Sequence, residues 1–207
     1  MAEPTDQPQT VGILIFDEVE VLDACGPFEV FAMASRLDPA TDARSPLFRV
    51  VTVAERPDPV RCTGGLLIQP HHTLADCPPL DLLVVPGGLG TRRERSNAAL
   101  LDWIAARSRA AALTTSVCTG AFLLAAAGLL DGRAATTHWA SIERMRGAHP
   151  AIDVRADARY VDEGPIVSAA GVSAGVDMAL YVVARLHGAE VANWTARQME
   201  YDWETGD

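Results

Sequence analysis

Short runs of apolar residues alternate along the chain with segments in which apolar residues recur at helical spacing. The apolar runs have the length of buried strands and occupy residues 11–16, 48–54, 81–85 and 113–117. Helical spacing is found over residues 28–34, 97–109, 121–130, 178–186 and 189–203. Because strands and helices alternate, the pattern predicts an α/β fold, with a mostly parallel sheet and helices on both of its faces.

The segments between these elements predict shorter features. We expect Gly26-Pro27 to break the chain, with the proline in the first turn of the helix that follows. The other expected features are a loop at 36–46, a hairpin at 60–69, short strands at 134–137, 154, 159–161 and 165–168, a helix at 142–145 and a strand-to-helix turn at 171–177. Residues 1–10 are predicted to be a disordered leader and residues 11–207 a single domain.

One strand-to-helix boundary has the composition of a catalytic turn. The apolar run at 113–117 ends at Cys118, and a helix-forming segment rich in Ala and Leu begins just after Gly120. Only a tight turn fits between the two elements, which is the geometry of a nucleophile elbow. Because free N–H groups at a helix start stabilise a thiolate, we expect a lowered pKa for a reactive Cys118 thiol. The alternative is that Cys118 is a small buried hydrophobic residue.

Other candidate residues also follow the ends of predicted strands. Asp23 comes after the first strand, Gly87-Gly88 after the strand at 81–85, and Gly171 after a later one. Ligands of parallel sheets bind beyond these carboxyl ends, so we expect the candidates to meet Cys118 there. Two alternatives stay open. Asp23 is either an exposed turn residue or a partly buried acid, and the glycine pair either turns its N–H groups toward a ligand or forms an ordinary turn.

Charge and composition disfavour several classes of function. The formal net charge is −10, and nucleic-acid binding needs clustered Lys and Arg. The basic cluster Arg92-Arg93-Glu94-Arg95 is broken by an acid and is expected to be a solvated loop or a helix start. The four cysteines form no C-x-x-C pair, and only His71-His72 are adjacent among the five histidines, so we expect neither a disulfide framework nor a metal.

No segment of the sequence has the features of a membrane span or a signal peptide. No apolar run reaches the ~18 residues that cross a bilayer. The first ten residues lack a basic region followed by an apolar one. We therefore expect a cytoplasmic protein without a membrane partner.

With these positions assembled, the chain resembles the ThiJ/PfpI superfamily, whose fold is similar to that of class I glutamine amidotransferases. The resemblance implies a flavodoxin-like (Rossmann-like) sheet with a nucleophile elbow, and it runs from about Val11 to Trp203. The matching motifs are Ile15-Phe16 to Gly26-Pro27, Val85-Pro86-Gly87-Gly88, Ser116-Val117-Cys118-Thr119-Gly120, Ala135-Thr136-Thr137-His138-Trp139 and Gly171 to Asp177. The elbow and the Ala-Thr-Thr-His-Trp motif together resemble one branch, which contains isocyanide hydratases and the amino-terminal sensor domains of AraC-type regulators.

The resemblance implies roles for individual residues. Cys118 would be the nucleophile, and Asp23 its acidic partner where many relatives have a glutamate. The amides of Gly88 and Thr119 would be oxyanion-type donors, with Gly87 beside them and Thr119 in the pocket lining. Protease-like members have a histidine directly after the nucleophile, so Thr119 disfavours peptidase or amidase activity. His138 is expected to be structural or pocket-lining rather than catalytic.

The activity implied by the resemblance is hydration of an isocyanide to an N-substituted formamide through a covalent thioimidate, with no metal or organic cofactor. One alternative is glyoxalase- or deglycase-like chemistry on small carbonyls, which the shorter Asp23 disfavours. The other is a non-catalytic ligand-sensing domain. AraC-type relatives carry a DNA-binding region after this domain, for which we expect no room before Asp207. A small-molecule substrate and a homodimer are the partners that the resemblance implies.

Overall fold

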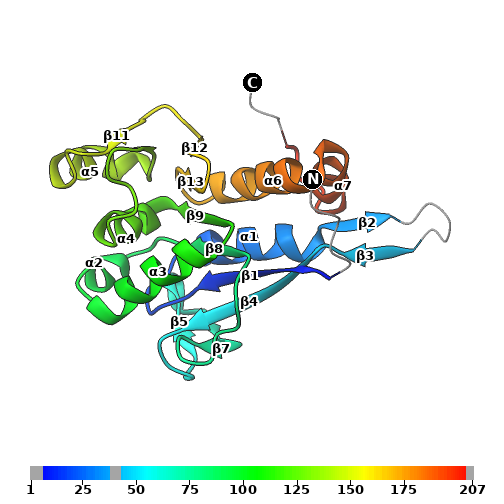
Figure 1. Ribbon diagram of the computed structural model, residues 1–207, viewed down its shortest axis with the longest axis horizontal. Helices are drawn as coiled ribbons and strands as arrows, with labels where there is room; N and C mark the ends of the chain where they lie inside the picture. Colours follow the sequence, from blue (N-terminus) through cyan, green and yellow to red (C-terminus); the bar gives the residue numbers. More distant parts are fainter. Residues whose placement is uncertain (1–6, 38–42, 204–207) are drawn as a thin grey trace.

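A seven-stranded sheet forms the centre of the computed structural model, which describes residues 7–37 and 43–203 (Figure 1). Its strand order is β12-β13-β9-β8-β1-β4-β7. All neighbouring strands are parallel except β12, which is antiparallel to β13. The strands are β1 (Gln9–Leu14), β4 (Phe48–Ala54), β7 (His72–Thr73), β8 (Leu82–Val85), β9 (Leu113–Val117), β12 (Tyr160–Asp162) and β13 (Ile166–Ala169). The predicted mostly parallel sheet is confirmed.

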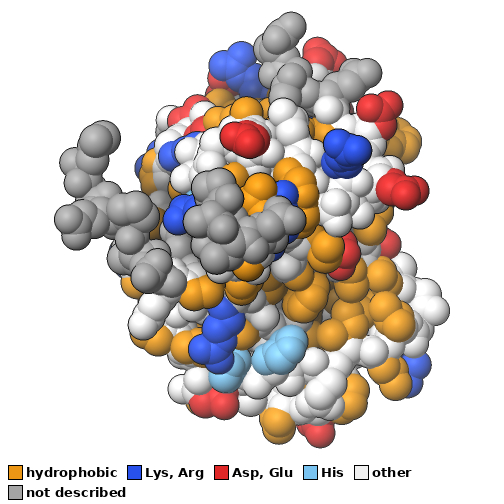
Figure 2. Space-filling view, turned by 90° about the vertical axis from the view of Figure 1, so that its right-hand side faces the viewer, with side chains coloured by type: hydrophobic (Ala, Val, Ile, Leu, Met, Phe, Trp, Pro, Cys, Tyr) orange, Lys and Arg blue, Asp and Glu red, His pale blue; other side chains and the backbone are white. Residues whose placement is uncertain are grey.

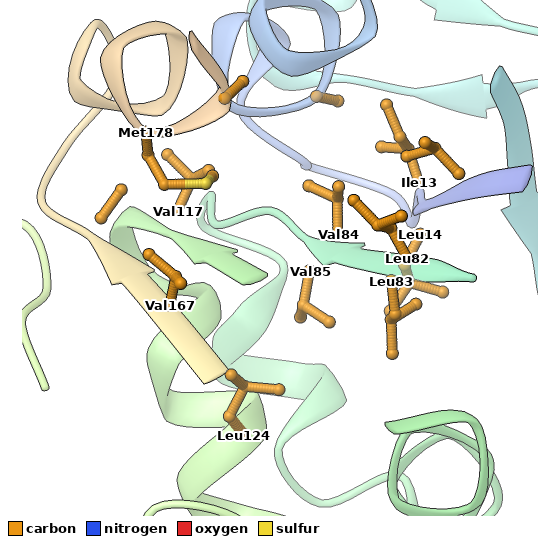
Figure 3. Close-up of a cluster of buried hydrophobic side chains, with 14 of the residues drawn as sticks. Ile13, Leu14, Leu82, Leu83, Val84, Val85, Val117, Leu124, Val167 and Met178 are labelled. Atoms are coloured by element: carbon orange, nitrogen blue, oxygen red, sulfur yellow. The ribbon is translucent and has the colours of Figure 1, made fainter. Parts of the chain in front are cut away.

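Helices cover both faces of this sheet, as the sequence predicts. On one face α1 packs against α6 and α7, and on the other α3 packs against α4 (Figures 1 and 3). Two further helices, α2 and α5, lie at the end of the sheet where α4 begins (Figure 1). The helices are α1 (Val21–Met33), α2 (Thr91–Glu94), α3 (Ala98–Ala110), α4 (Ala121–Ala126), α5 (Ile142–Ala148), α6 (Ala174–His187) and α7 (Ala189–Gln198).

The core lies in two layers, one on each side of the central strands. In β8, Val84 points toward the face covered by α1 and α6, and Val85 toward the face covered by α4 (Figure 3). Met178 of α6 and Leu124 of α4 close the two layers, and all four side chains are fully buried. Strands buried on both faces explain why the sequence shows continuous apolar runs instead of alternation.

Short strand pairs complete the fold. They are β2 (Ser35–Leu37) with β3 (Arg44–Pro46), β5 (Val60–Arg61) with β6 (Leu67–Ile68), and β10 (Ala134–Ala135) with β11 (Asp153–Val154). The hairpin predicted at 60–69 is confirmed. The loop predicted at 36–46 is wrong at both ends, because residues 35–37 and 44–46 pair as an antiparallel ladder. Residues 38–42 lie outside the described residues.

The predicted break at Gly26-Pro27 is also wrong, because α1 begins at Val21 and runs through both residues. Proline has a helical φ and removes only one backbone hydrogen bond, which tertiary packing offsets here. Gly26 is needed for the approach of two helices: a Cβ there would lie 3.0 Å from Cγ2 of Val176 in α6. Asp23 therefore lies in the first turn of α1 and not in a segment before it.

Two predicted element boundaries also differ from those in the structure. Strand β1 begins at Gln9, because the N–H of Gln9 donates to the carbonyl of Leu47 at 2.9 Å, so residues 9 and 10 are not a leader. Residues 1–6 of the predicted leader lie outside the described residues. The last helix ends at Gln198 and not at residue 203. Glu200 has a φ of +48°, and the N–H of Tyr201 returns to the carbonyl of Ala196 at 2.9 Å, which terminates a helix.

Candidate active site

Cys118 lies on a sharp turn between strand β9 and helix α4. The short 3₁₀ turn η2 (Cys118–Gly120) joins the two elements, and Cys118 has a φ of +57°. A non-glycine residue in this left-handed region is strained and persists only where its surroundings hold it. The N–H of Cys118 donates to the carbonyl of Ala170, and the hydroxyl of Thr137 donates to the carbonyl of Cys118 at 2.7 Å. The structure thus has the geometry of the predicted nucleophile elbow.

Gly120 allows the elbow to pack against the neighbouring strand. A Cβ at this position would lie 2.1 Å from the carbonyl oxygen of Val85 and 2.8 Å from that of Pro86. Backbone atoms cannot give way as a flexible side chain does. The lack of a side chain at Gly120 therefore lets the backbone close up at the turn.

Asp23 is fully buried, which decides between the two interpretations of this residue. Its Oδ2 accepts a hydrogen bond from the N–H of Gly87 at 3.0 Å. Its Oδ1 is buried and has no hydrogen bond of normal geometry among the described residues. The thiol of Cys118 and the N–H of Val172 face the same carboxyl group. A buried carboxyl oxygen without a full partner, next to a thiol, is suited to proton transfer.

Burial raises the pKa of both acids of the pair. Burial raises the pKa of Asp23 to about 7, against the opposing effects of the Gly87 N–H and the Cys118 thiol. Burial and then the charge of Asp23 raise the pKa of the Cys118 thiol to about 12, although the N–H of Thr119 stabilises the thiolate. The expectation of a lowered thiol pKa is therefore wrong, because these two effects outweigh the helix start. Above the pKa of Asp23 the two groups retain one proton between them.

The glycine pair after β8 contacts the other site residues closely. The N–H of Gly88 donates to Oγ1 of Thr119 at 2.9 Å, and that hydroxyl lies 3.2 Å from the carbonyl of Gly88. A Cβ at Gly87 would lie 2.5 Å from the nitrogen of Thr119 and 2.8 Å from Oδ2 of Asp23. Both glycine amides thus donate to side chains within the site. The Thr119 N–H, one of the two predicted oxyanion donors, faces the sulfur of Cys118. The oxyanion roles of the Thr119 and Gly88 amides stay predictions.

A cavity of about 300 Å³ opens above Cys118 and Thr119. His138 lies in its lining, as predicted. Its Nδ1 accepts from the N–H of Ala140 at 3.3 Å and so caps the 3₁₀ turn η3 (Trp139–Ser141). Its ring packs on Gly171, where a Cβ would lie 2.4 Å from Cδ2. These contacts give His138 a structural and pocket-lining place, while a catalytic role stays untested.

The lining includes charged and backbone-donating residues that were not found from the sequence. They are Glu20, Arg92, Arg144 and Val172. Arg92 belongs to the basic cluster that was interpreted as a solvated loop or helix start. The cluster does form helix α2, but Arg92 lies at the cavity. The other three carry no signal in one sequence, because only the folded chain brings the start of α1, helix α5 and the turn before α6 together.

No group of three metal-ligating side chains is found within residues 7–37 and 43–203. The adjacent histidines have other partners: Nδ1 of His71 is 2.8 Å from the hydroxyl of Thr52, and Nδ1 of His72 is 3.8 Å from Asp76. In the same part of the chain, no helix has the length and apolar character needed to span a bilayer.

A sequence profile described as the DJ-1/PfpI family matches residues 9–185. The chain belongs to the DJ-1/PfpI family. This DJ-1/PfpI chain is 37% identical over 193 residues to an isonitrile hydratase from Pseudomonas putida, which covers 92% of the chain and 78% of that protein. The predicted ThiJ/PfpI resemblance is therefore confirmed.

Other relatives of this DJ-1/PfpI protein are regulators. It is 28% identical over 195 residues to the HTH-type transcriptional regulator GbdR of Pseudomonas aeruginosa, and it spans 51% of that protein's length. Among solved structures, a ThiJ/PfpI family protein from Pseudomonas syringae has a TM-score of 0.83 at 31% identity, covering 100% of this chain and 84% of that one. An AraC family regulator from Pseudomonas putida has a TM-score of 0.75 at 23% identity, covering 93% and 100%, and shows the shared fold alone.

Proposed function

We propose that the protein is a cysteine-dependent hydratase that adds water to an isocyanide and releases an N-substituted formamide. The observation that supports this most directly is the pairing of Cys118 with a buried Asp23 beneath a cavity. A strained cysteine with a proton-donating carboxyl group beside it suits covalent addition to a small unsaturated carbon. The similarity to an isonitrile hydratase supports the same reaction.

In the first step the sulfur of Cys118 forms a bond to the terminal carbon of the isocyanide, R–N≡C. The proton that Cys118 and Asp23 share is delivered by Asp23 to the same carbon. The product is the thioimidate R–N=CH–S–Cys118, so the thiol has added across one carbon without any other reagent. Asp23 with its pKa raised to about 7 is suited to both giving and taking a proton near neutral pH.

In the second step Asp23, now a carboxylate, accepts a proton from a water molecule whose oxygen bonds to the thioimidate carbon. Asp23 then gives this proton to the nitrogen of the former thioimidate, the carbon–sulfur bond breaks as the new hydroxyl group becomes a carbonyl, and R–NH–CHO leaves. The proton of the new hydroxyl group returns to the Cys118–Asp23 pair. One water is consumed in the cycle, and the enzyme returns to its starting state. The N–H of Thr119, which faces the sulfur, stabilises the departing thiolate.

The decisive experiment incubates the purified protein separately with an alkyl isocyanide and with methylglyoxal. We expect N-alkylformamide from the isocyanide, followed by mass spectrometry or NMR, and no turnover of the dicarbonyl. Cys118→Ala should lower the hydration rate by about 10³-fold or more, because the covalent step is lost. Turnover of methylglyoxal alone, or hydration that survives Cys118→Ala, would contradict the proposal.

A ligand-sensing function is the second candidate, and the regulator relatives favour it. A sensor would bind a small molecule in the Cys118 cavity without converting it. Saturable binding of an isocyanide by calorimetry, with no formamide formed over hours, would support the sensor and contradict the hydratase.

Three further expectations stay proposals of the same kind. They are one domain over residues 11–207, a homodimer and a cytoplasmic location, which rest on the sequence and the resemblance. Light scattering coupled to gel filtration measures the oligomeric state directly, as a mass of one or two chains.

A further inference from the structure

Two arginines line the Cys118 cavity. Arg92 is in helix α2 and Arg144 in helix α5. Within residues 7–37 and 43–203 neither makes an ion pair, and the side chain of Arg92 makes no hydrogen bond. Arg144 donates to Oγ of Ser141 at 3.1 Å and lies 4.6 Å above the ring of Phe122. Its guanidinium is thus held in place by neutral groups and keeps donors for another partner.

A neighbouring arginine does have acidic partners. Arg93, next to Arg92 in the sequence, lies 2.8 Å from Glu94 and 3.6 Å from Glu18. The chain has 17 basic and 27 acidic residues, so acidic partners are abundant. At the end of the molecule opposite the cavity, acidic and basic side chains are intermixed around hydrophobic ones (Figure 2). Arg92 and Arg144, by contrast, line the Cys118 cavity and have no acidic partner among the described residues, so both keep donors for an anion.

Like charges gather around Arg144. Burial lowers its pKa first, and the positive charges of Arg92 and Arg95 lower it further, which places all three cations within electrostatic range of one another. Arg95 also makes no ion pair or side-chain hydrogen bond in the described part of the chain. Mutual repulsion of this kind is relieved when an anion binds between the cations.

One acidic side chain also lines the cavity. Glu20, at the start of α1, is in the lining, and its charge raises the pKa of Asp23 and of Cys62. It makes no ion pair with Arg92 or Arg144. The lining therefore carries one acid, at the start of α1, and two arginines, on α2 and α5. A ligand with a neutral reactive end and one negative charge fits this polarity, whereas a dianion would meet more repulsion from Glu20 and the Cys118–Asp23 pair.

We propose that Arg92 and Arg144 bind a carboxylate of the substrate and hold its other end over Cys118. The guanidinium fork of arginine matches a carboxylate in geometry, and the hydroxyl of Ser141, which accepts from Arg144, keeps its own proton to donate. Resting on the proposed hydratase function, this assigns the substrate class as isocyanides that carry a carboxylate. The anion site itself does not depend on that reaction.

The first test uses two thiol reagents of nearly the same shape, neutral iodoacetamide and anionic iodoacetate. Their alkylation rates at Cys118 are followed by peptide mass spectrometry, and the quantity measured is the ratio of the iodoacetate rate to the iodoacetamide rate. Arg144→Gln should lower this ratio about 10-fold, because one charge-assisted contact is lost. Arg144→Lys keeps the charge and should retain most of the ratio.

Two further variants control this test. Arg92→Gln removes a side chain without a partner in the described residues, so folding is not at risk, and it should lower the ratio in the same direction. Arg109→Gln removes an exposed charge in the last turn of α3, which precedes β9, whereas Cys118 follows the opposite end of that strand. This control variant should leave the ratio unchanged. If Arg144→Gln and Arg92→Gln slow both reagents equally, the arginines act on the thiolate, and the proposal is overturned.

The second test separates this proposal from the hydratase function. Hydration of ω-isocyanoalkanoates of increasing chain length is compared with that of their methyl esters. We expect a higher kcat/KM for the acid at one or more chain lengths, and a preference that falls about 10-fold in Arg144→Gln. Equal kcat/KM values for acids and esters would overturn the anion site and leave the hydratase standing. Charge-selective alkylation without hydration of any isocyanide would overturn the hydratase and leave the anion site standing.

Discussion

Asp23 is the residue whose chemistry and stability are most closely linked. Its side chain is fully buried, and burial raises its pKa to about 7. Between about pH 4 and pH 7 the folded state therefore binds a proton that the unfolded state has released. The stability contributed by the neutral carboxyl is complete below the ordinary pKa of aspartate and is lost as pH rises through the folded-state value. We estimate the loss as about 4 kcal/mol.

Asp23→Asn should therefore change the pH dependence of stability. Asparagine keeps an oxygen for the N–H of Gly87 and has no charge to desolvate. At pH 8 the variant should be more stable than the wild type by up to about 4 kcal/mol, and near pH 4 the difference should almost vanish. Urea denaturation at the two pH values measures this. A difference that is the same at both values would show that Asp23 is not the titrating group.

Gly120 and Gly147 form a matched pair of glycines without positive φ. A Cβ at Gly120 would lie 2.1 Å from the Val85 carbonyl oxygen, whereas a Cβ at Gly147 in α5 would meet nothing within 4 Å. Gly120→Ala should lower the free energy of unfolding by about 3 kcal/mol through overpacking. Gly147→Ala should raise it by about 0.5–1 kcal/mol through helix propensity. Equal effects in chemical denaturation would contradict the close packing of the elbow.

At the scale of elements, the start of α6 is tied to the strands beside the active site. The nearly buried carboxylate of Asp177 accepts from Arg159 and, at 2.9 Å, from the hydroxyl of Tyr201. The carbonyl of Arg159 accepts from the N–H of Ala170, whose own carbonyl accepts from Cys118. A continuous series of hydrogen bonds thus links the first turn of α6 to the elbow.

Two tyrosine variants test how much the Asp177 contact contributes. Tyr201→Phe should lower the free energy of unfolding by about 2 kcal/mol, because a hydrogen bond to a charged and nearly buried acceptor is lost. Tyr181 donates to Asp162 at 2.6 Å, but the Asp162 side chain is 24% exposed, so Tyr181→Phe should cost about 1 kcal/mol or less. The opposite order in urea denaturation would show that burial of the acceptor does not govern these contacts.

The long buried strands and their helices could be predicted because their signal is local. Residues 48–54 form a strand over the predicted range, and α3 begins just after Asn97, whose side chain caps it. The chain break predicted at Gly26-Pro27 is wrong because the packing of α1 against Val176 of α6 outweighs the local preference of these two residues. The end of α7 was missed because Glu200, and not a glycine, adopts the left-handed conformation.

The site was predictable where its residues follow the ends of strands. Cys118, Asp23 and Gly87-Gly88 meet because parallel strands end at the same edge of the sheet. The direction of the Cys118 pKa was not predictable, because it depends on burial and on a carboxylate 95 positions away in the printed sequence. Arg92 and Arg144 were not found because nothing in one sequence indicates that α2 and α5 lie over one cavity.

At the scale of the whole molecule, the order of the strands predicts a gradient of local stability. Strands β1 and β8 lie inside the sheet with a neighbour on each side, and their side chains from Val11 to Leu14 and from Leu82 to Val85 are almost completely buried. Their amides should exchange with deuterium most slowly, while those of β10 and β11 in their separate small sheet should exchange fastest. Mass spectrometry of exchanged peptides measures this, and fast exchange in β8 would contradict the assigned order.

The two borders of the central sheet also have a consequence for solutions of high concentration. One border is β7, with two residues, and the other is β12, with three residues in the reverse direction. A short border presents few free backbone groups to another molecule, so it is a poor template for the growth of fibrils. The five apolar inner strands of the sheet are thereby kept between neighbouring strands. An adjacent copy of the protein meets few free backbone N–H and C=O groups with which it could extend the sheet.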